Sequence, residues 1–288
     1  MKQLIVNADD FGLTAGVNAG IVRAFRDGIL TSTTLTANGA AFCDAVEQAK
    51  RNPGLGVGCH LVLVGDCAVA PRERVSSLVN RKGQLPVSLF SLVARLAGGR
   101  IRIQEIEQEF LAQIERLRSS GIEPTHLDTH KHTHSIPQVM DAMMRVAKES
   151  GISRVRKPYE DAKHGSAAAR RNGKGKLKQR TLAAAARQTA PRFARLVRQN
   201  GVRTPDYFYG IHQTGSLRSE ALLEILETLP DGTSELMSHP GFCDAALQHL
   251  STRLKHQREE ELAALIDPSA RRMVERQGIR LITYRELN

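Results

Sequence analysis

Short β-rich segments alternate with helical segments along almost the whole chain, and this alternation restricts the fold more than any other feature. Between the β-rich runs, apolar residues recur at helical spacing, as in residues 15–29 and 103–121. The expected strands cover residues 3–9, 31–38, 56–64, 124–134, 154–159, 205–215, 233–241 and 279–287. Strands separated by helices form parallel sheets. Eight of them in 288 residues favour an α/β fold of the TIM-barrel-like (β/α) barrel type over an open sheet.

Positive charge is concentrated in one segment of the chain. Residues 154–200 contain 14 lysines and arginines and two acidic residues, whereas the rest of the chain has 27 basic and 28 acidic residues. We therefore expect residues 1–288 to form a single barrel domain that carries a basic helical insertion at approximately residues 160–200. A Lys- and Arg-rich helix can contact an anionic membrane. The structural alternative is a solvated surface without a partner. The near-neutral remainder and the lack of interleaved aromatic residues argue against nucleic-acid binding.

No apolar run in the sequence reaches the roughly 20 residues that a membrane-spanning helix needs. The N-terminal segment MKQLIVNADD also has too short an apolar stretch for a signal peptide. We therefore expect a cytoplasmic protein whose membrane contact, if the basic insertion provides one, is peripheral and at the inner face.

Acidic residues and histidines gather where the expected strands end. Asp9 and Asp10 close the first strand, His60 lies in the third, and His239 follows the seventh. The fourth strand and its continuation contribute His126, Asp128, His130, His132 and His134. In a barrel of parallel strands the carboxyl ends of all strands meet at one face, where active sites lie. We therefore expect these side chains to converge.

Together, histidine and carboxylate form a ligand set for Zn²⁺, Fe²⁺, Mn²⁺ or Mg²⁺. Asp9 and Asp10 are adjacent, and their carboxylates repel each other unless a cation or a proton lies beside them. We expect one to bind a divalent metal ion and the other to act as a base toward water. Each motif alone also has a structural interpretation: a capped turn for the two aspartates, a packed core histidine for His60, and a solvated polar loop for residues 126–134.

Four segments resemble the YdjC-like (chitooligosaccharide deacetylase-like) carbohydrate deacetylases: NADDFGLTAGVNAGI, GVGCHLVLV, PTHLDTHKHTHSIPQV and SHPGFCD. They occur in order up to about residue 244, so the resemblance covers most of the chain. The segments HLVLV and DYFYGIHQTG are most similar to the hopanoid biosynthesis-associated branch. The resemblance implies a TIM-barrel-like hydrolase that removes the N-acetyl group from an N-acetylated amino sugar, in that branch from a hopanoid glycolipid. It also implies one divalent metal ion, magnesium, zinc or a similar ion.

The resemblance extends to individual residues. It implies that Asp10, His60 and His130 bind the metal. Asp9 matches the catalytic base, and His239 matches an acid or an oxyanion-stabilising partner. The basic stretch at residues 163–180 departs from the compact loop of the family, which leaves the wall on the substrate side undefined.

Three further polar residues have less specific roles. Asp128 is a candidate for orienting a ligand histidine. His132 and His134 are candidates for bordering the substrate groove, and they suit a polar loop equally well.

Another metal-dependent hydrolase, an amidohydrolase or a phosphoesterase, is the alternative function. Such enzymes often use more ligands, sometimes with two metal ions about 3.5–4 Å apart. A content of two metal ions per chain would therefore favour this alternative. The sequence leaves open which metal and which sugar are bound, and whether the chain forms a homodimer.

Overall fold

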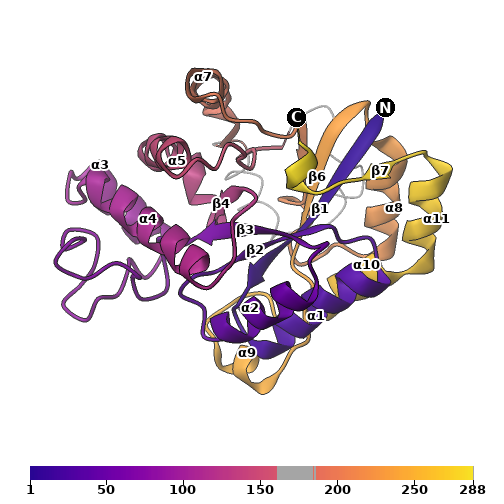
Figure 1. Ribbon diagram of the computed structural model, residues 1–288, viewed down its shortest axis with the longest axis horizontal. Coiled ribbons are helices and arrows are strands. Elements are labelled where there is room, and N and C mark those ends of the chain that lie inside the picture. The colour runs from indigo at the N-terminus through magenta and orange to yellow at the C-terminus, as the bar shows by residue number, and fades with distance from the viewer. Residues whose placement is uncertain (161–183, 185, 288) are drawn as a thin grey trace.

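A curved sheet of parallel strands forms the centre of the structure, and helices lie outside it (Figure 1). The computed structural model describes residues 1–160, 184 and 186–287, so much of the basic helical insertion expected at residues 160–200 lies outside the described residues. The strands are β1 Lys2–Phe11, β2 Ser32–Leu35, β3 Gly56–Leu61, β4 Leu127–Thr129, β5 Tyr207–Tyr209, β6 Gly232–Ser238 and β7 Arg280–Leu281. Six of them follow the order β4-β3-β2-β1-β6-β5, and β7 pairs with β1.

Two isolated parallel bridges extend this sheet beyond β4. Leu127 pairs with Val155, and Arg154 pairs with Arg203, which lies just before β5 in the chain. Since β5 in turn pairs with β6, the parallel pairings lead from β4 round to β6, and the predicted barrel-like α/β fold is confirmed. The predicted strand at 154–159 is reduced to these bridges, because Pro158 cannot donate a ladder hydrogen bond.

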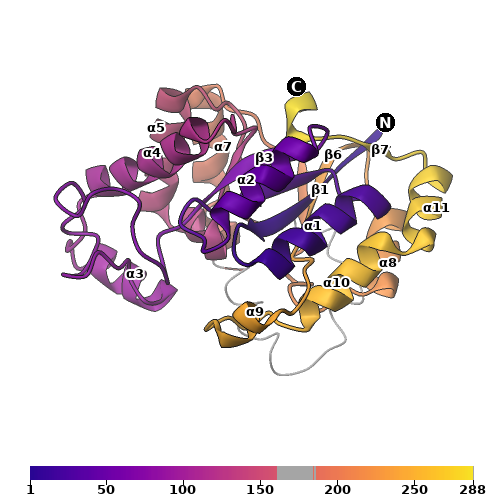
Figure 2. The ribbon, with the colours of Figure 1, turned by 60° about the horizontal axis from the view of Figure 1, so that its bottom comes forward.

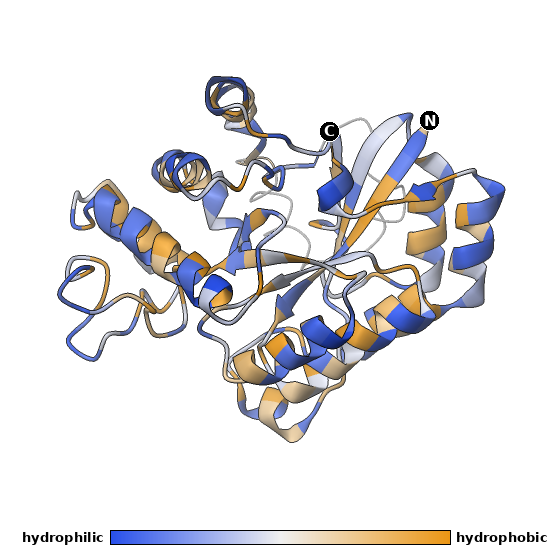
Figure 3. Ribbon diagram, in the orientation of Figure 1, coloured by the Kyte–Doolittle hydropathy of each residue, from blue (hydrophilic) through white to orange (hydrophobic). Residues whose placement is uncertain are grey.

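Helices with one apolar side cover the sheet (Figures 2 and 3). They are α1 Ala15–Asp27, α2 Phe42–Arg51, α3 Leu89–Ala97, α4 Ile103–Ser119, α5 Pro137–Ser150, α7 Ala190–Asn200, α8 Ser219–Thr228, α9 Ala245–His249, α10 Gln257–Ile266 and α11 Pro268–Arg276. In α1, for example, Val17, Ile21 and Ala24 recur at helical spacing and are fully buried. Within the described part of the chain, no helix has the length and apolar character to cross a bilayer.

Gly58 in β3 makes room for an aromatic stack inside the barrel. The ring of His126 stacks on Tyr284 with centroids 3.6 Å apart and an interplanar angle of 9°. A Cβ atom on residue 58 would lie 2.4 Å from Cε1 of His126, far inside van der Waals contact. Glycine at this position therefore allows the stack to form against β3.

We expect Gly58→Ala to lower the free energy of unfolding by about 1–3 kcal/mol, because the new methyl group overpacks the barrel interior. Denaturant unfolding measures this loss. His126→Ala removes the obstructing ring, so the double variant should be more stable than the sum of the two single losses predicts. Additive losses would contradict the packing explanation.

Candidate active site

Asp10 of β1, His60 of β3 and His130, which directly follows β4, bring one ligand atom each to a common point. Asp10 Oδ1 lies 3.5 Å from His60 Nε2 and 3.3 Å from His130 Nδ1, and the two ring nitrogens are 3.3 Å apart. Ligand atoms around one ion with bonds of about 2.1 Å have separations of this size. The His130 side chain is 29% exposed, whereas His60 and Asp10 are nearly buried, so solvent reaches the triad beside His130. The three residues therefore fit a single divalent metal ion.

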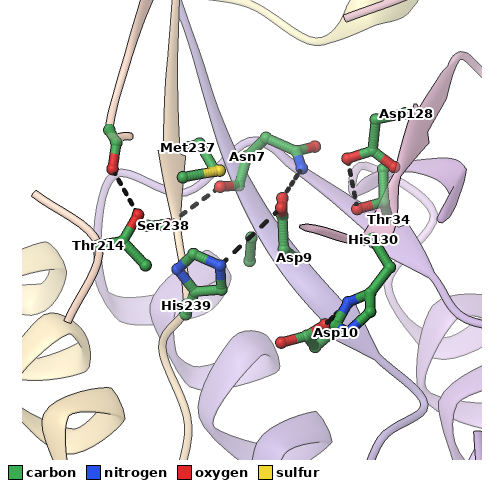
Figure 4. A network of polar contacts seen from close by, with 12 residues as sticks. Asn7, Asp9, Asp10, Thr34, Asp128, His130, Thr214, Met237, Ser238 and His239 are labelled. Atoms are coloured by element: carbon green, nitrogen blue, oxygen red, sulfur yellow. Dashed lines mark hydrogen bonds and ion pairs between the residues drawn. The ribbon is translucent and has the colours of Figure 1, made fainter. Parts of the chain in front are cut away.

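An irregularity in β1 allows both aspartates to face the site. Asp10 has a φ of 68°, in the left-handed region that non-glycine residues rarely occupy. The register of the β1–β2 pairing shifts between Ala8 and Phe11, as in a β-bulge. In a regular strand adjacent side chains point to opposite faces. Here Asp9 and Asp10 both offer a carboxylate oxygen within 4.8 Å of a ring nitrogen of His60, so the two side chains line one site (Figure 4).

Asp9 does not belong to the metal triad, and a buried arginine holds it. Arg156 Nη2 donates to Asp9 Oδ1 at 2.7 Å and Nη1 donates to Oδ2 at 2.8 Å, while Asn7 Nδ2 donates to Oδ1 at 3.1 Å. Burial raises the pKa of the Asp9 carboxyl, but the charges of Arg156, His60 and His239 and the hydrogen bonds from Arg156 together outweigh it, and the pKa lies well below its usual range. Asp9 is therefore a carboxylate at neutral pH.

Arg156 joins three buried acids. Besides Asp9, its guanidinium contacts Asp128 Oδ2 at 2.5 Å and Glu235 Oε1 at 2.8 Å. Tyr284 Oη, from the C-terminal segment, donates to Glu235 Oε2 at 2.5 Å. The side chain of Arg156 is completely buried. It belongs by sequence to the basic segment 154–200, yet it contributes nothing to a basic surface.

Asp128 lies in hydrogen-bonding contact with His60, and its predicted role in orienting a ligand histidine stays a prediction. Asp128 Oδ1 lies 2.8 Å from His60 Nδ1, and Thr34 Oγ1 donates to Asp128 Oδ2 at 3.1 Å. With Nδ1 occupied, Nε2 of His60 faces Asp10 and His130. Burial lowers the pKa of His60, but the hydrogen bond to Asp128 and the charges of Asp128, Asp9 and Asp10 together outweigh it and raise the pKa to about 9. A carboxylate on the far nitrogen of a ligand histidine fixes the ring and makes the near nitrogen a better donor.

The strand predicted to continue to residue 134 ends at Thr129. Residues His130–Ser135 form a 3₁₀ helix in which Lys131 and His132 have φ of 54° and 51°. Consequently, the alternation along the strand does not extend to the later histidines. Because a 3₁₀ helix follows β4 directly, the chain bends at His130, and the His130 side chain lies beside Asp10 instead of extending the strand.

His132 and His134 occupy different positions. His132 Nε2 lies 3.2 Å from Met237 Sδ, and burial lowers the pKa of His132 to about 3. His134 is fully buried, with Nδ1 2.6 Å from Thr129 Oγ1, and burial places its pKa well below the usual value. His134 is therefore a packed, neutral histidine rather than a solvated loop residue. A contact of either histidine with substrate stays a prediction.

His239 faces Asp9 from the other side of the site (Figure 4). Its Nε2 lies 4.0 Å from Asp9 Oδ2. Glu261 of α10 accepts a hydrogen bond from the backbone N–H of His239 at 2.6 Å, and Nδ1 of the ring lies 3.8 Å from the same carboxylate oxygen. His239 thus lies between two carboxylates, with its Nε2 edge toward the base candidate.

Sequence reasoning found the residues with recognisable chemistry and missed those that hold them. It did not identify Arg156, Glu235, Arg258, Glu261 or Tyr284 as parts of the site. Each stands in a segment that looks like an ordinary strand or charged helix, and only Arg156 had a noticeable setting, as one basic residue among many. The sequence contains no spacing that connects these residues to the strand ends.

Comparison with known proteins shows the family of this chain. The model of the YdjC-like protein family matches residues 3–276, so the chain belongs to that family. A carbohydrate deacetylase of Geobacillus stearothermophilus is 36% identical over 99% of this chain and 98% of its own. A chitooligosaccharide deacetylase of Yersinia enterocolitica is 32% identical, with 98% of both chains covered. A crystal structure from Enterococcus faecalis, named for a suggested role in cellobiose-phosphate cleavage, superposes with a TM-score of 0.79 at 26% identity, covering 98% of this chain and 97% of its own. The predicted family is confirmed, whereas the hopanoid biosynthesis-associated branch stays a prediction.

Proposed function

We propose that this protein is a metal-dependent hydrolase that removes the N-acetyl group from an N-acetylated amino sugar. The observation that carries the proposal is the convergence of Asp10, His60 and His130 beside Asp9, a separate carboxylate. The ligand atoms of Asp10, His60 and His130 suit a divalent ion, and the carboxylate of Asp9 lies beside these atoms without being one of the three ligands. Relatives over the full chain length are carbohydrate deacetylases, which supports the amide of an acetylated sugar as the bond that is cleaved.

A divalent ion held by Asp10, His60 and His130 would supply a Lewis acid that polarises the acetyl carbonyl and makes a nearby water more acidic. Asp9 accepts the proton that this water loses as its oxygen attacks the carbonyl carbon. Arg156 keeps Asp9 ionised and fixes both of its oxygens, so the carboxylate does not turn toward the triad. So strongly paired a carboxylate is a weak base, and it therefore depends on a water that is already acidified.

His239 is placed to assist the second half of the reaction. When the C–N bond breaks, the nitrogen of the sugar needs a proton, and a protonated His239 can donate it from Nε2. Its ring lies across Asp9 from the triad and is backed by Glu261. The products are acetate and a free amino sugar, so the atoms of water are divided between the two.

Arg156 bears on the alternative of a two-metal hydrolase. Asp9, His60 and Asp128 form a second group with metal-ligand geometry. In this structure the guanidinium of Arg156 binds both acids of that group and supplies the positive charge that a second ion would bring. We therefore expect one metal ion per chain. A content of two ions would instead favour the phosphoesterase or amidohydrolase alternative.

The proposal has a direct test. We expect the purified protein to release acetate from N-acetylglucosamine oligosaccharides, and chelation followed by dialysis to abolish most of this activity, with recovery when Zn²⁺ or Mg²⁺ is returned. Running N-acetylated glycolipids in parallel tests the narrower prediction of a hopanoid glycolipid substrate. A chelator-insensitive activity, or no acetate from any acetylated sugar, would contradict the proposal.

Peripheral membrane contact, a cytoplasmic location and a homodimer remain predictions from the sequence. The basic insertion on which the first depends lies largely outside the described residues. Vesicle sedimentation with and without anionic lipid, compared with retention on DNA, would separate the membrane prediction from nucleic-acid binding.

A further inference from the structure

A second buried arginine binds the metal-ligand aspartate directly. Arg258 of α10 has a side chain that is 1% exposed, and its Nη2 donates to Asp10 Oδ2 at 2.5 Å. The other oxygen of the same carboxylate, Oδ1, faces His60 and His130. The carboxylate of Asp10 therefore has Arg258 at one oxygen and the two ligand histidines at the other. A bound metal ion and Arg258 would share Asp10.

The fold places Arg258 there through several independent contacts. Its Nε donates to the carbonyl of Leu254, and its own carbonyl accepts from the N–H of Gly241. A Cβ atom on residue 241 would lie 3.3 Å from Cδ of Arg258, so glycine lets the arginine pass closely. Nη1 of Arg258 has no hydrogen-bond partner among the residues that the structure describes. A surface ion pair would not need such a setting, and a buried arginine is retained at a cost in desolvation.

We propose that Arg258 is a positioning residue that adjusts the strength of the metal site. It confines Asp10 to one-oxygen binding and withdraws negative charge from that carboxylate. A nearby positive charge opposes the binding of a cation, especially at a buried site with a low effective dielectric constant. The bound ion then receives less charge from Asp10 and acts as a stronger Lewis acid on the substrate. Arg258 accordingly lowers metal affinity and raises the rate of the chemical step.

A purely structural role for Arg258 predicts the opposite change in metal affinity. If the arginine only held α10 against the barrel, its loss would disorder Asp10 and weaken metal binding together with activity. If it adjusts the charge of the site, its neutral replacement should bind the ion more tightly and turn over more slowly. The sign of the change in metal affinity therefore distinguishes the two roles, and it does so without any substrate.

The test uses the full chain, stripped of metal with a chelator and titrated calorimetrically with Zn²⁺ and, separately, with Mg²⁺. We expect Arg258→Gln to bind the ion at least about tenfold more tightly than the wild type. The ion should also raise the melting temperature of this variant by more than it raises that of the wild type. The kcat for acetate release should fall about tenfold or more. Arg258→Lys, which keeps the charge, should restore both quantities toward the wild type.

Arg218→Gln is the matched control, since Arg218 also pairs with an acid of α10, Glu260, but its side chain is 65% exposed. It should change neither metal affinity nor kcat. Weaker or unchanged metal binding by Arg258→Gln would overturn the proposal. If that variant does not fold, Arg258→Lys decides: near wild-type affinity supports the proposal, and a loss as large as that of Asp10→Asn overturns it. The inference rests on the proposed metal-dependent function: a wild-type chain that binds no ion would overturn both, whereas a wild type that binds the ion beside an Arg258→Gln variant that does not bind it more tightly would overturn the role of Arg258 alone.

Discussion

The Asp9→Asn variant is expected to bind its metal ion normally and to lose about 10²–10⁴-fold in kcat, the contribution of a positioned proton acceptor. An amide cannot accept the proton of the attacking water, while the triad of Asp10, His60 and His130 keeps all of its ligand atoms. The shape of the side chain is unchanged, so the loss reports on charge and proton acceptance.

Two measurements make this expectation specific. Metal content after dialysis should stay at one ion per chain in Asp9→Asn, whereas the adjacent Asp10→Asn should lose both metal and turnover. The melting temperature reports separately on the broken pair with Arg156. If Asp9→Asn keeps its metal and near-normal activity, another group accepts the proton and the assignment of Asp9 is wrong.

Replacing Arg156 by methionine is expected to cause the largest loss of stability. The substitution leaves Asp9, Asp128 and Glu235 buried without their shared positive charge. Removing one partner of a buried ion pair costs about 3–5 kcal/mol, because the remaining charge is neither solvated nor compensated. Acidic pH should recover part of the loss, since protonation removes the uncompensated charges.

Denaturant unfolding at several pH values checks this prediction. Arg145→Met is the matched control, because Arg145 pairs with Glu107 and its side chain is 52% exposed. That variant should lose no more than about 1 kcal/mol. Arg156→Lys, which keeps the charge without two-point geometry, should fall between the two and should still lower kcat. Equal losses in Arg156→Met and Arg145→Met would show that the buried network does not stabilise the fold.

The pKa of Glu235 is consistent with a network in which one arginine is shared by three buried acids. Burial raises the pKa of its carboxyl to about 7, although Arg156 and the hydroxyl of Tyr284 act in the opposite direction. A carboxyl whose pKa is raised in the folded state contributes most stability at low pH and loses it as the pH rises through about 7. The charge of Arg156 is thus divided among more acids than it fully compensates.

Local sequence determined the elements and the chemistry of the site. Alternation of β-rich and helical segments is a property of short windows, and it was enough to predict a parallel barrel. The convergence of acids and histidines was also predictable, because the carboxyl ends of parallel strands meet at one face whatever the details of packing. Adjacent aspartates at such a strand end and histidines on other strands are therefore expected at the same face of the barrel. The choice of Asp10, His60 and His130 as metal ligands came instead from the family resemblance and stays a prediction.

Tertiary structure decided how those residues are used. The bulge that lets Asp9 and Asp10 face the same site is part of the pairing between β1 and β2. These strands are separated in the sequence by a helix, so a short stretch of sequence does not reveal the bulge. Arg156 and Arg258 reach the two aspartates from positions 147 and 248 residues away in the sequence. The energy of a buried charge depends on what surrounds it in space, so only the folded chain could show which arginine each aspartate is paired with.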